Sequence, residues 1–192
     1  MQALRKRGGE LKKILFFLLL LSSVAQAGIC YREGMPIDLL TQCADQGDVN
    51  AQRNLGLMYF NGDGVTKDYN LAFRWYIKAA EQGDAHAQFN LGLMYKEASG
   101  VLIDDDKAFE WFSKAAEQGY ADAQNYLGLA YAKGEGTPQD YLLSYMWLSL
   151  SAAQNNPNAI KFKDQIMKKM TPDQITTSQQ MTDKWLTDHK KN

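Results

Sequence analysis

One segment of the chain recurs three times at a constant offset of 36 residues. Residues 44–64 read ADQGDVNAQRNLGLMYFNGDG, and closely similar text begins again at residues 80 and 116. Between residues 46–81 and 82–117, 21 of 36 positions are identical. A fixed period of this length is typical of repeat arrays, in which neighbouring units bury each other's apolar faces.

Each repeat contains two helical patterns joined by a short connection. In the first copy, Ala51, Leu55, Met58 and Tyr59 recur at three- and four-residue spacing, and a second such stripe runs over residues 71–80. Between the stripes, NGDGVTKD has two glycines and ends at an aspartate, as expected for a tight connection before a helix N-terminus. No segment alternates as a strand would. We therefore predict an all-α solenoid, an α/α superhelix of three tandem 36-residue helix-turn-helix repeats.

The repeat offset also sets the predicted domain boundaries. We predict repeats at residues 48–83, 84–119 and 120–156, an N-terminal arm and capping helix at 28–47, and C-terminal capping helices at 157–192. In MTPDQ, Thr171 has the place of an N-cap, Pro172 that of the first helical residue, and Gln174 completes a capping box. Such caps hide the end faces of an open array.

Small and aromatic residues return at fixed places in every copy. Gly56, Gly92 and Gly128 are equivalent, and because glycine is unfavourable inside a helix, its return predicts a second helix crossing closely there. A tryptophan also recurs near the end of each unit, at Trp75, Trp111 and Trp147. We expect these rings in the core, because large aromatic side chains at helical spacing usually pack there.

The motifs AQFNLGLMY, GDGV and DYNLAFRWYIKAAEQG, with their copies, resemble the Sel-one-like repeat family, relatives of the tetratricopeptide repeats. The resemblance covers most of the chain after residue 27. It implies a right-handed superhelix of antiparallel helix pairs and, because members of this family serve as adaptors, a protein or peptide partner that the resemblance does not identify. The third copy departs from the pattern at Leu150 and Ser151, where the other copies have Lys-Ala.

The first 27 residues have the composition of a secretory signal peptide. A basic segment precedes the apolar run from Ile14 to Leu21, and Ala25 and Ala27 occupy the small positions of a cleavage site. The apolar run is too short for a bilayer span. We therefore expect export to the periplasm or the medium and no membrane span after signal removal. Removing the leader changes the formal net charge from −1 to −5.

The export prediction leaves two states open for the two cysteines. Cys30 and Cys43 both follow the leader, and an even count in an oxidising compartment favours a disulfide that would join the N-terminal arm to the first helix. The alternative is two thiols, with Cys43 a small buried residue. Ala79 and Ala115 have its place in the next two copies, and spacing alone cannot show whether the side chains meet.

Motifs for catalysis, cofactors and metals are missing from the sequence. The two histidines, His86 and His189, have no cysteine or carboxylate neighbours at metal-ligand spacing. GDGVTKDYN and IDDDK lack the frame of a calcium loop, and no phosphate-binding glycine loop or nucleophile motif occurs. No stripe of basic and aromatic residues indicates nucleic-acid binding. We predict no catalytic residues, no metal and no cofactor.

One face of the first helix differs among copies while its surroundings do not. By resemblance to tetratricopeptide arrays, this face lines the inner groove. We expect Phe60 and Phe89 to anchor a partner and Arg53 and Lys96 to pair with its acidic groups. The alternative is a solvated face that varies without selection. The candidate partner-binding residues are Asn50, Arg53, Phe60, His86, Phe89, Lys96, Asp122, Asn125 and Lys133.

Three classes of function remain. The leading one is an exported scaffold for protein or peptide binding, because an extended stack of helices offers a long surface. The second is a hydrolase of cell-wall or beta-lactam compounds, as claimed for cysteine-rich relatives in the family that the chain resembles. Those relatives carry paired cysteines in each repeat, which this chain lacks. The third is a structural subunit of an envelope complex.

Overall fold

The computed structural model describes residues 35–189, and these residues form helices and no strand. The predicted signal peptide and Cys30 lie outside the described residues. In chain order the helices are α2 (Ile37–Asp45), α3 (Val49–Asn61), α4 (Tyr69–Glu81), α5 (Ala85–Glu97), α6 (Asp105–Glu117), α7 (Ala121–Lys133), α8 (Tyr141–Ala153), α9 (Pro157–Met167) and α10 (Pro172–His189). None of these helices is both long enough and apolar enough to cross a bilayer.

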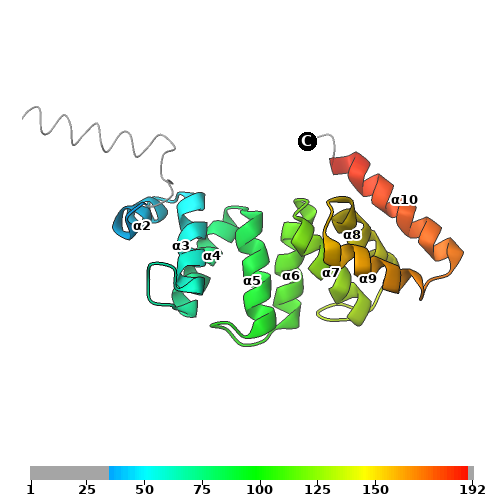
Figure 1. The fold of residues 1–192 in the computed structure, drawn as a ribbon, viewed down its shortest axis with the longest axis horizontal. Helices are drawn as coiled ribbons and strands as arrows, with labels where there is room; N and C mark the ends of the chain where they lie inside the picture. Colours follow the sequence, from blue (N-terminus) through cyan, green and yellow to red (C-terminus); the bar gives the residue numbers. More distant parts are fainter. Residues whose placement is uncertain (1–34, 190–192) are drawn as a thin grey trace, which may run out of the picture.

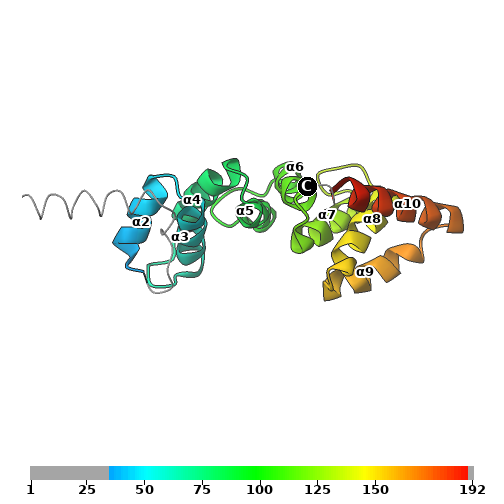
Figure 2. The same ribbon diagram turned by 90° about the horizontal axis from the view of Figure 1, so that it is seen from above.

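The helices form an elongated stack of antiparallel pairs (Figure 1). Helices α3 and α4, α5 and α6, and α7 and α8 pair within the three repeats, and α4 with α5 and α6 with α7 join one repeat to the next. Figure 2 shows the first helices of the pairs along one side of the stack and α4 and α6 along the other. The prediction of an all-α solenoid of three tandem repeats is confirmed.

Side-chain caps fix where most of these helices begin. Asp48 and Asp84 accept hydrogen bonds from the backbone N–H groups of Ala51 and Ala87, at 2.7 and 2.8 Å. Aspartates at positions 68, 104 and 140 cap the second helices in the same way. Each cap satisfies a backbone donor that has no partner inside the helix. The same spacing of aspartates therefore sets the same helix starts in successive repeats.

The mid-helix glycines lie where the two helices of a pair cross, as their recurrence predicts. A Cβ atom at Gly56 would lie 2.6 Å from the Tyr76 ring, and one at Gly92 would lie 2.5 Å from the Phe112 ring. The third pair is similar, with Leu148 opposite Gly128. A larger residue would force the helices apart. These glycines therefore define the separation of the helices within each repeat.

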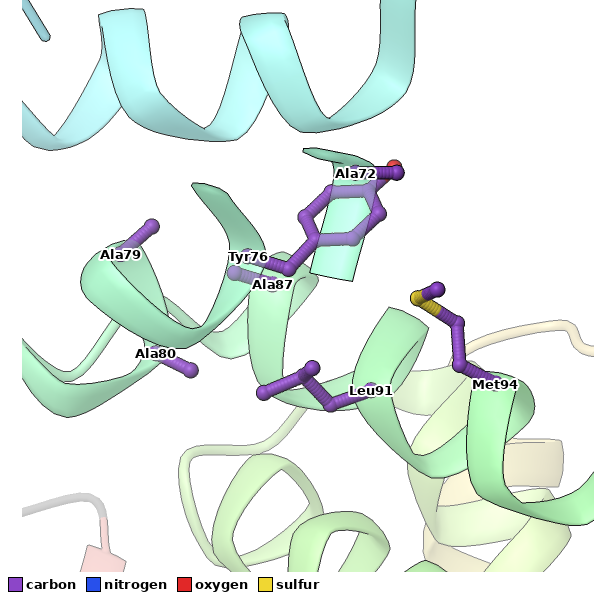
Figure 3. Close-up of a cluster of buried hydrophobic side chains, with 7 residues drawn as sticks. All are labelled: Ala72, Tyr76, Ala79, Ala80, Ala87, Leu91 and Met94. Carbon is purple, nitrogen blue, oxygen red and sulfur yellow. The ribbon is translucent and has the colours of Figure 1, made fainter. Parts of the chain in front are cut away.

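The core is a series of clusters at the helix pairs and at the boundaries between them. Figure 3 shows one such cluster, in which side chains of α4 meet side chains of α5. Tyr76, Leu91 and Met94 are its largest buried members. Alanines fill the remaining positions, and their small size allows close approach of the helices. The seven residues of this cluster are Ala72, Tyr76, Ala79, Ala80, Ala87, Leu91 and Met94.

A buried glutamine connects the first helix of each repeat to the helix that precedes it. Gln88 donates a hydrogen bond from Nε2 to the carbonyl oxygen of Ala80 and accepts one at Oε1 from Gln118. Gln52 and Gln124 make the corresponding bonds, with Gln82 and Gln154 as their donors. Because buried polar groups need partners, this arrangement fixes the register between units. It occurs three times with the period of the sequence repeat.

The last helix packs on the second helix of the third repeat. Its start has the predicted capping box, since Thr171 N–H donates to Gln174 Oε1 at 2.9 Å and Gln174 N–H donates to Thr171 Oγ1 at 3.3 Å. Helix α10 then contacts α8, with its Trp185 ring edge-on to Trp147 at 5.9 Å between centroids. Trp147 is buried as a result, whereas Trp75 and Trp111 are only half-buried.

Candidate partner-binding surface

The candidate surface lies on the side of α3, α5 and α7, the first helices of the three repeats, that faces away from the helix-pair cores. We call it the first-helix surface. In every copy its middle is a leucine: Leu57 is 45% exposed, and Leu93 and Leu129 are half-buried. The polar and aromatic side chains predicted from the sequence lie to either side of this leucine row, because helix positions three and four apart share a face.

At the amino-terminal ends of these helices, Arg53 has partners within the chain. Its Nη1 lies 2.7 Å from Asp84 Oδ2, and its Nη2 donates to Asn50 Oδ1 at 3.0 Å. Because Asp84 belongs to the second repeat, this ion pair joins two units. Asn50, His86 and Asp122, at the same position in α3, α5 and α7, are exposed. We expected the positive charge of Arg53 to attract an acidic partner. Asp84 already pairs with that charge inside the array, so the attraction for a partner is weaker than expected.

At the carboxyl-terminal ends, Lys96 and Lys133 share one carboxylate. Lys96 Nζ lies 2.6 Å from Glu135 Oε2, and Lys133 Nζ lies 3.2 Å from Glu135 Oε1. Burial alone would raise the pKa of Glu135, but the hydrogen bonds and the positive charges of the two lysines together outweigh it and lower the pKa. Lys96 thus joins the second repeat to the third, as Arg53 joins the first to the second.

The two phenylalanines predicted as anchors contact other aromatic rings of the chain. Phe60 lies edge-on to Tyr69, with 5.1 Å between ring centroids. Phe89 lies among Tyr120, Tyr126 and Phe112, at 5.2, 5.5 and 5.8 Å. Both phenylalanines are half-buried. Neighbouring rings therefore hold both side chains in place, and Phe89 contributes to the packing between the second and third repeats.

Asn125 does not belong on an accessible surface. Only 4% of it is exposed, and among the described residues its Oδ1 has no hydrogen-bond partner. The helical pattern placed Asn125 on the varying face, but the aromatic rings around Phe89 and Tyr126 broaden the buried part of α7. We therefore remove Asn125 from the candidate set. The other eight predicted residues lie along the first-helix surface.

Sequence reasoning missed the leucine row itself, together with Tyr126 in α7. Leu57, Leu93 and Leu129 are identical in the three copies, and the binding surface was sought only among positions that differ between copies. The missed signal was their spacing, because each follows the buried leucine of its helix by two residues and must point away from it.

The described part of the chain shows no group of three His, Cys, Asp or Glu side chains that could hold a metal ion. Cys43 is buried in the cluster of Leu40, Ala44, Ala51 and Leu55 that covers the first repeat. Its pairing with Cys30 stays a prediction, because Cys30 lies outside the described residues.

Comparison with known proteins gives matches at the level of sequence and of structure. The family model of the Sel1 repeat matches residues 49–84, 85–120 and 121–156. No curated protein sequence matches significantly.

Two solved structures are similar over most of the described residues. One is c5321, a protective antigen present in uropathogenic Escherichia coli strains and displaying an SLR fold, with 32% identity and a TM-score of 0.72. The match covers 87% of this chain but only 36% of c5321, so the chain spans about a third of that protein. A Sel1 repeat protein from Oxalobacter formigenes has 41% identity and a TM-score of 0.62, over 66% of this chain and 95% of that one. With three consecutive repeats matched over more than half of its length, the chain belongs to the Sel1 repeat family.

Proposed function

We propose that the chain is an exported, non-catalytic scaffold that binds a protein or an extended peptide along the first-helix surface. Sel1 repeat proteins are generally scaffolds for protein interactions. The observation that carries the proposal is the row of Leu57, Leu93 and Leu129, which offers the same apolar contact once in each repeat.

The surroundings of the leucine row supply specificity in this proposal. Next to it the three copies differ, with Asn50 in the first, His86 in the second and Asp122 in the third, all exposed. A ligand with apolar side chains at regular intervals would fill the row, while its polar groups would distinguish one repeat from the next. The ion pairs of Arg53 and Lys96 hold the repeats at a fixed spacing, which reduces the ordering cost of binding.

Export to the periplasm or the medium belongs to the same proposal and rests on the composition of residues 1–27. Intact-mass measurement of the protein from the cell envelope or the medium tests it. We expect a chain that begins near Gly28. Recovery of the full 192 residues in the exported fraction would contradict cleavage.

Affinity capture from envelope extract, with mild crosslinking, tests the binding function. We expect the native chain to capture one or a few defined proteins. The double variant Leu57→Glu with Leu93→Glu should lose them, because two charges replace the apolar contacts. Leu102→Glu is the matched control, since Leu102 is 88% exposed but lies in the loop between α5 and α6. It should capture the same proteins as the native chain.

Circular dichroism and thermal unfolding of each variant separate loss of binding from loss of fold. If the double variant folds and captures the same proteins as the native chain, the first-helix surface is not the binding surface. A partner that stays bound to both variants through 1 M salt and copurifies at a fixed ratio would instead indicate a structural subunit.

A further inference from the structure

A groove lies between the amino-terminal capping helix and the first repeat. Helix α2 and the loop between α3 and α4 lie together at that end of the stack (Figure 1), and the groove between them has a volume of about 430 Å³. Its apolar lining consists of Ile37 from α2, Tyr59 from α3, Val65 from the loop and Leu71 from α4, all half-buried. The groove includes none of the residues assigned to the first-helix surface.

The other two boundaries show which side chains normally pack at this place. Between the first and second repeats, Phe73 of α4 lies edge-on to Tyr95 of α5, with 5.7 Å between ring centroids and 86° between planes. Between the second and third repeats, Phe109 of α6 lies edge-on to Tyr131 of α7, at 5.3 Å and 86°. The same pair of rings, at the same offset of 36 residues, therefore joins successive repeats.

Next to the capping helix, an isoleucine replaces the phenylalanine. Tyr59 has the place of the two tyrosines, and Ile37 has that of the two phenylalanines. Among the residues that the structure describes, Tyr59 takes part in no aromatic pair and no cation–π contact. Tyr95, in contrast, contacts Phe73 and also has Lys107 Nζ 5.2 Å from its ring centre. The groove therefore lies where the other two boundaries hold a phenylalanine ring.

Two of the three charged side chains beside the groove already have contacts within the chain. Asp68 accepts a hydrogen bond from the backbone N–H of Leu71 at 3.0 Å, as the N-cap of α4. Lys67 Nζ lies 4.6 Å from the centre of the Tyr69 ring. The third, Asp38, is exposed and would repel a carboxylate. The groove therefore fits an uncharged aromatic group better than an acidic one.

We propose that this groove receives an aromatic side chain of a protein or peptide partner. The ring packs edge-on to Tyr59, as Phe73 does to Tyr95, because the edge of one aromatic ring is attracted to the face of another. Val65 and Leu71 supply apolar contacts to the same ring. The existence of a partner rests on the proposed function, but this contact is separate from the leucine row and is tested without it.

The probe for the test is N-acetyl-phenylalanine amide, a single aromatic residue without a charge. It is titrated into the native chain at millimolar concentrations while NMR follows the backbone amide resonances. We expect saturable shifts at Val65, Thr66 and Leu71, which line the groove. N-acetyl-leucine amide should bind about fivefold more weakly, since it offers apolar contact without the pair of rings.

Ile37→Phe restores the residue of the other two boundaries and should weaken binding at least tenfold, because its ring fills the groove beside Tyr59. The melting temperature should stay at the native value or rise, since the new ring packs as Phe73 and Phe109 do. Leu39→Phe is the matched control. Leu39 lies on the same helix and is 47% exposed, but it does not line the groove. This variant should bind the probe with the native affinity.

The proposal is overturned if the native chain shows no saturable shifts at the groove, or if folded Ile37→Phe binds the probe as tightly as native. Equal binding of N-acetyl-leucine amide or of N-acetyl-arginine amide would overturn the choice of an aromatic group. If the probe binds only after Tyr31→Ala, the occupant is residue 31 of this chain rather than a partner. Self-association of the native chain that Ile37→Phe abolishes would assign the groove to a second copy instead. The double variant Leu57→Glu with Leu93→Glu should bind the probe like native, so the groove and the leucine row can fail separately.

Discussion

At the scale of single residues, comparison of the three repeats shows which side chains lower the stability of the fold. Tyr76, Phe112 and Leu148 have the same place opposite the mid-helix glycines. Tyr76 is fully buried, and among the described residues its hydroxyl has no hydrogen-bond partner. Burial also raises the pKa of this hydroxyl above its usual value, because the phenolate would be desolvated.

Tyr76→Phe should therefore stabilise the protein, by about 1 kcal/mol in the free energy of unfolding at pH 7. The second repeat already has phenylalanine at this place. Because the native pKa is raised, the native state disfavours the phenolate, and stability should fall as the pH rises above about 10, where unfolded tyrosine ionises. Urea unfolding of both proteins at pH 7 and in the alkaline range measures both effects.

The variant should lose less stability in alkali than the native chain. Some loss should remain, because burial also raises the pKa of Tyr120, Tyr126 and Tyr131. A marked loss of stability at pH 7 would mean that the Tyr76 hydroxyl has a favourable partner.

A second residue is strained at a helix end. Helices α3 and α7 end at Gly62 and Gly134 with φ values of 85° and 78°, but α5 ends at Ala98 with a φ of 57°. This left-handed conformation costs an alanine about 1 kcal/mol and glycine almost nothing.

Ala98→Gly should therefore raise the free energy of unfolding by about 0.5 to 1 kcal/mol, allowing for the greater freedom of glycine in the unfolded chain. Urea unfolding measures the difference. Ala132→Gly, inside the last turn of α7, is the control and should lower stability by about the same amount. If both variants are destabilised, strain at Ala98 is absent in solution.

At the scale of elements, α8 differs from the other second helices because α10 covers it. Arg74 and Lys78 of α4 correspond to Glu110 and Lys114 of α6, but to Met146 and Leu150 of α8. Helix α8 has no charged residue at all. A helix without a polar face must be buried on all sides, and α10 supplies the missing cover.

Leu150→Lys restores the residue of the other repeats and should detach the end of α10. Leu150 is buried, so an uncompensated lysine there should lower the free energy of unfolding by about 3 kcal/mol. Tryptophan fluorescence should shift to longer wavelength as Trp185 and Trp147 become exposed to water. The reverse change, Lys114→Leu, is the control and should leave both readings near native, since Lys114 is exposed. Unchanged fluorescence in Leu150→Lys would mean that α10 does not depend on Leu150.

The sequence predicted the elements better than it predicted the surface. Helix pairing follows from features that recur every 36 residues, such as the capping aspartates and the glycines opposite Tyr76 and Phe112. The partners of Arg53 and Lys96 did not follow, because each lies more than 30 residues away, in a different unit. The cover of α8 by α10 could have been predicted from the lack of charges in residues 141–153, although the contact of Trp185 with Trp147 could not.

At the scale of the whole molecule, stability depends on contacts between adjacent repeats. Arg53 with Asp84, Lys96 with Glu135, and the bonds from the buried Gln88 and Gln124 to backbone carbonyl oxygens of the preceding repeat all cross a boundary between neighbours. In such an array each unit contacts only its neighbours, so the free energy is close to a sum of unit and boundary terms. The central repeat contacts a repeat on each side. A destabilising substitution there should therefore lower the stability of both neighbours.

Trp111→Ala tests this coupling. The ring is half-buried against the cluster of Tyr76 and Leu91, with Lys114 above it, so its loss should lower the free energy of unfolding by about 2 to 4 kcal/mol. Hydrogen exchange should show the largest loss of protection in α4 to α7 and smaller losses in α2 and α10, because nearest-neighbour coupling weakens with distance. Trp75→Ala is the comparison and should affect mainly α2 to α5, since its ring packs against Leu40 and Cys43 at the first boundary. Equal loss of protection in every helix of both variants would contradict nearest-neighbour coupling and indicate one cooperative unit.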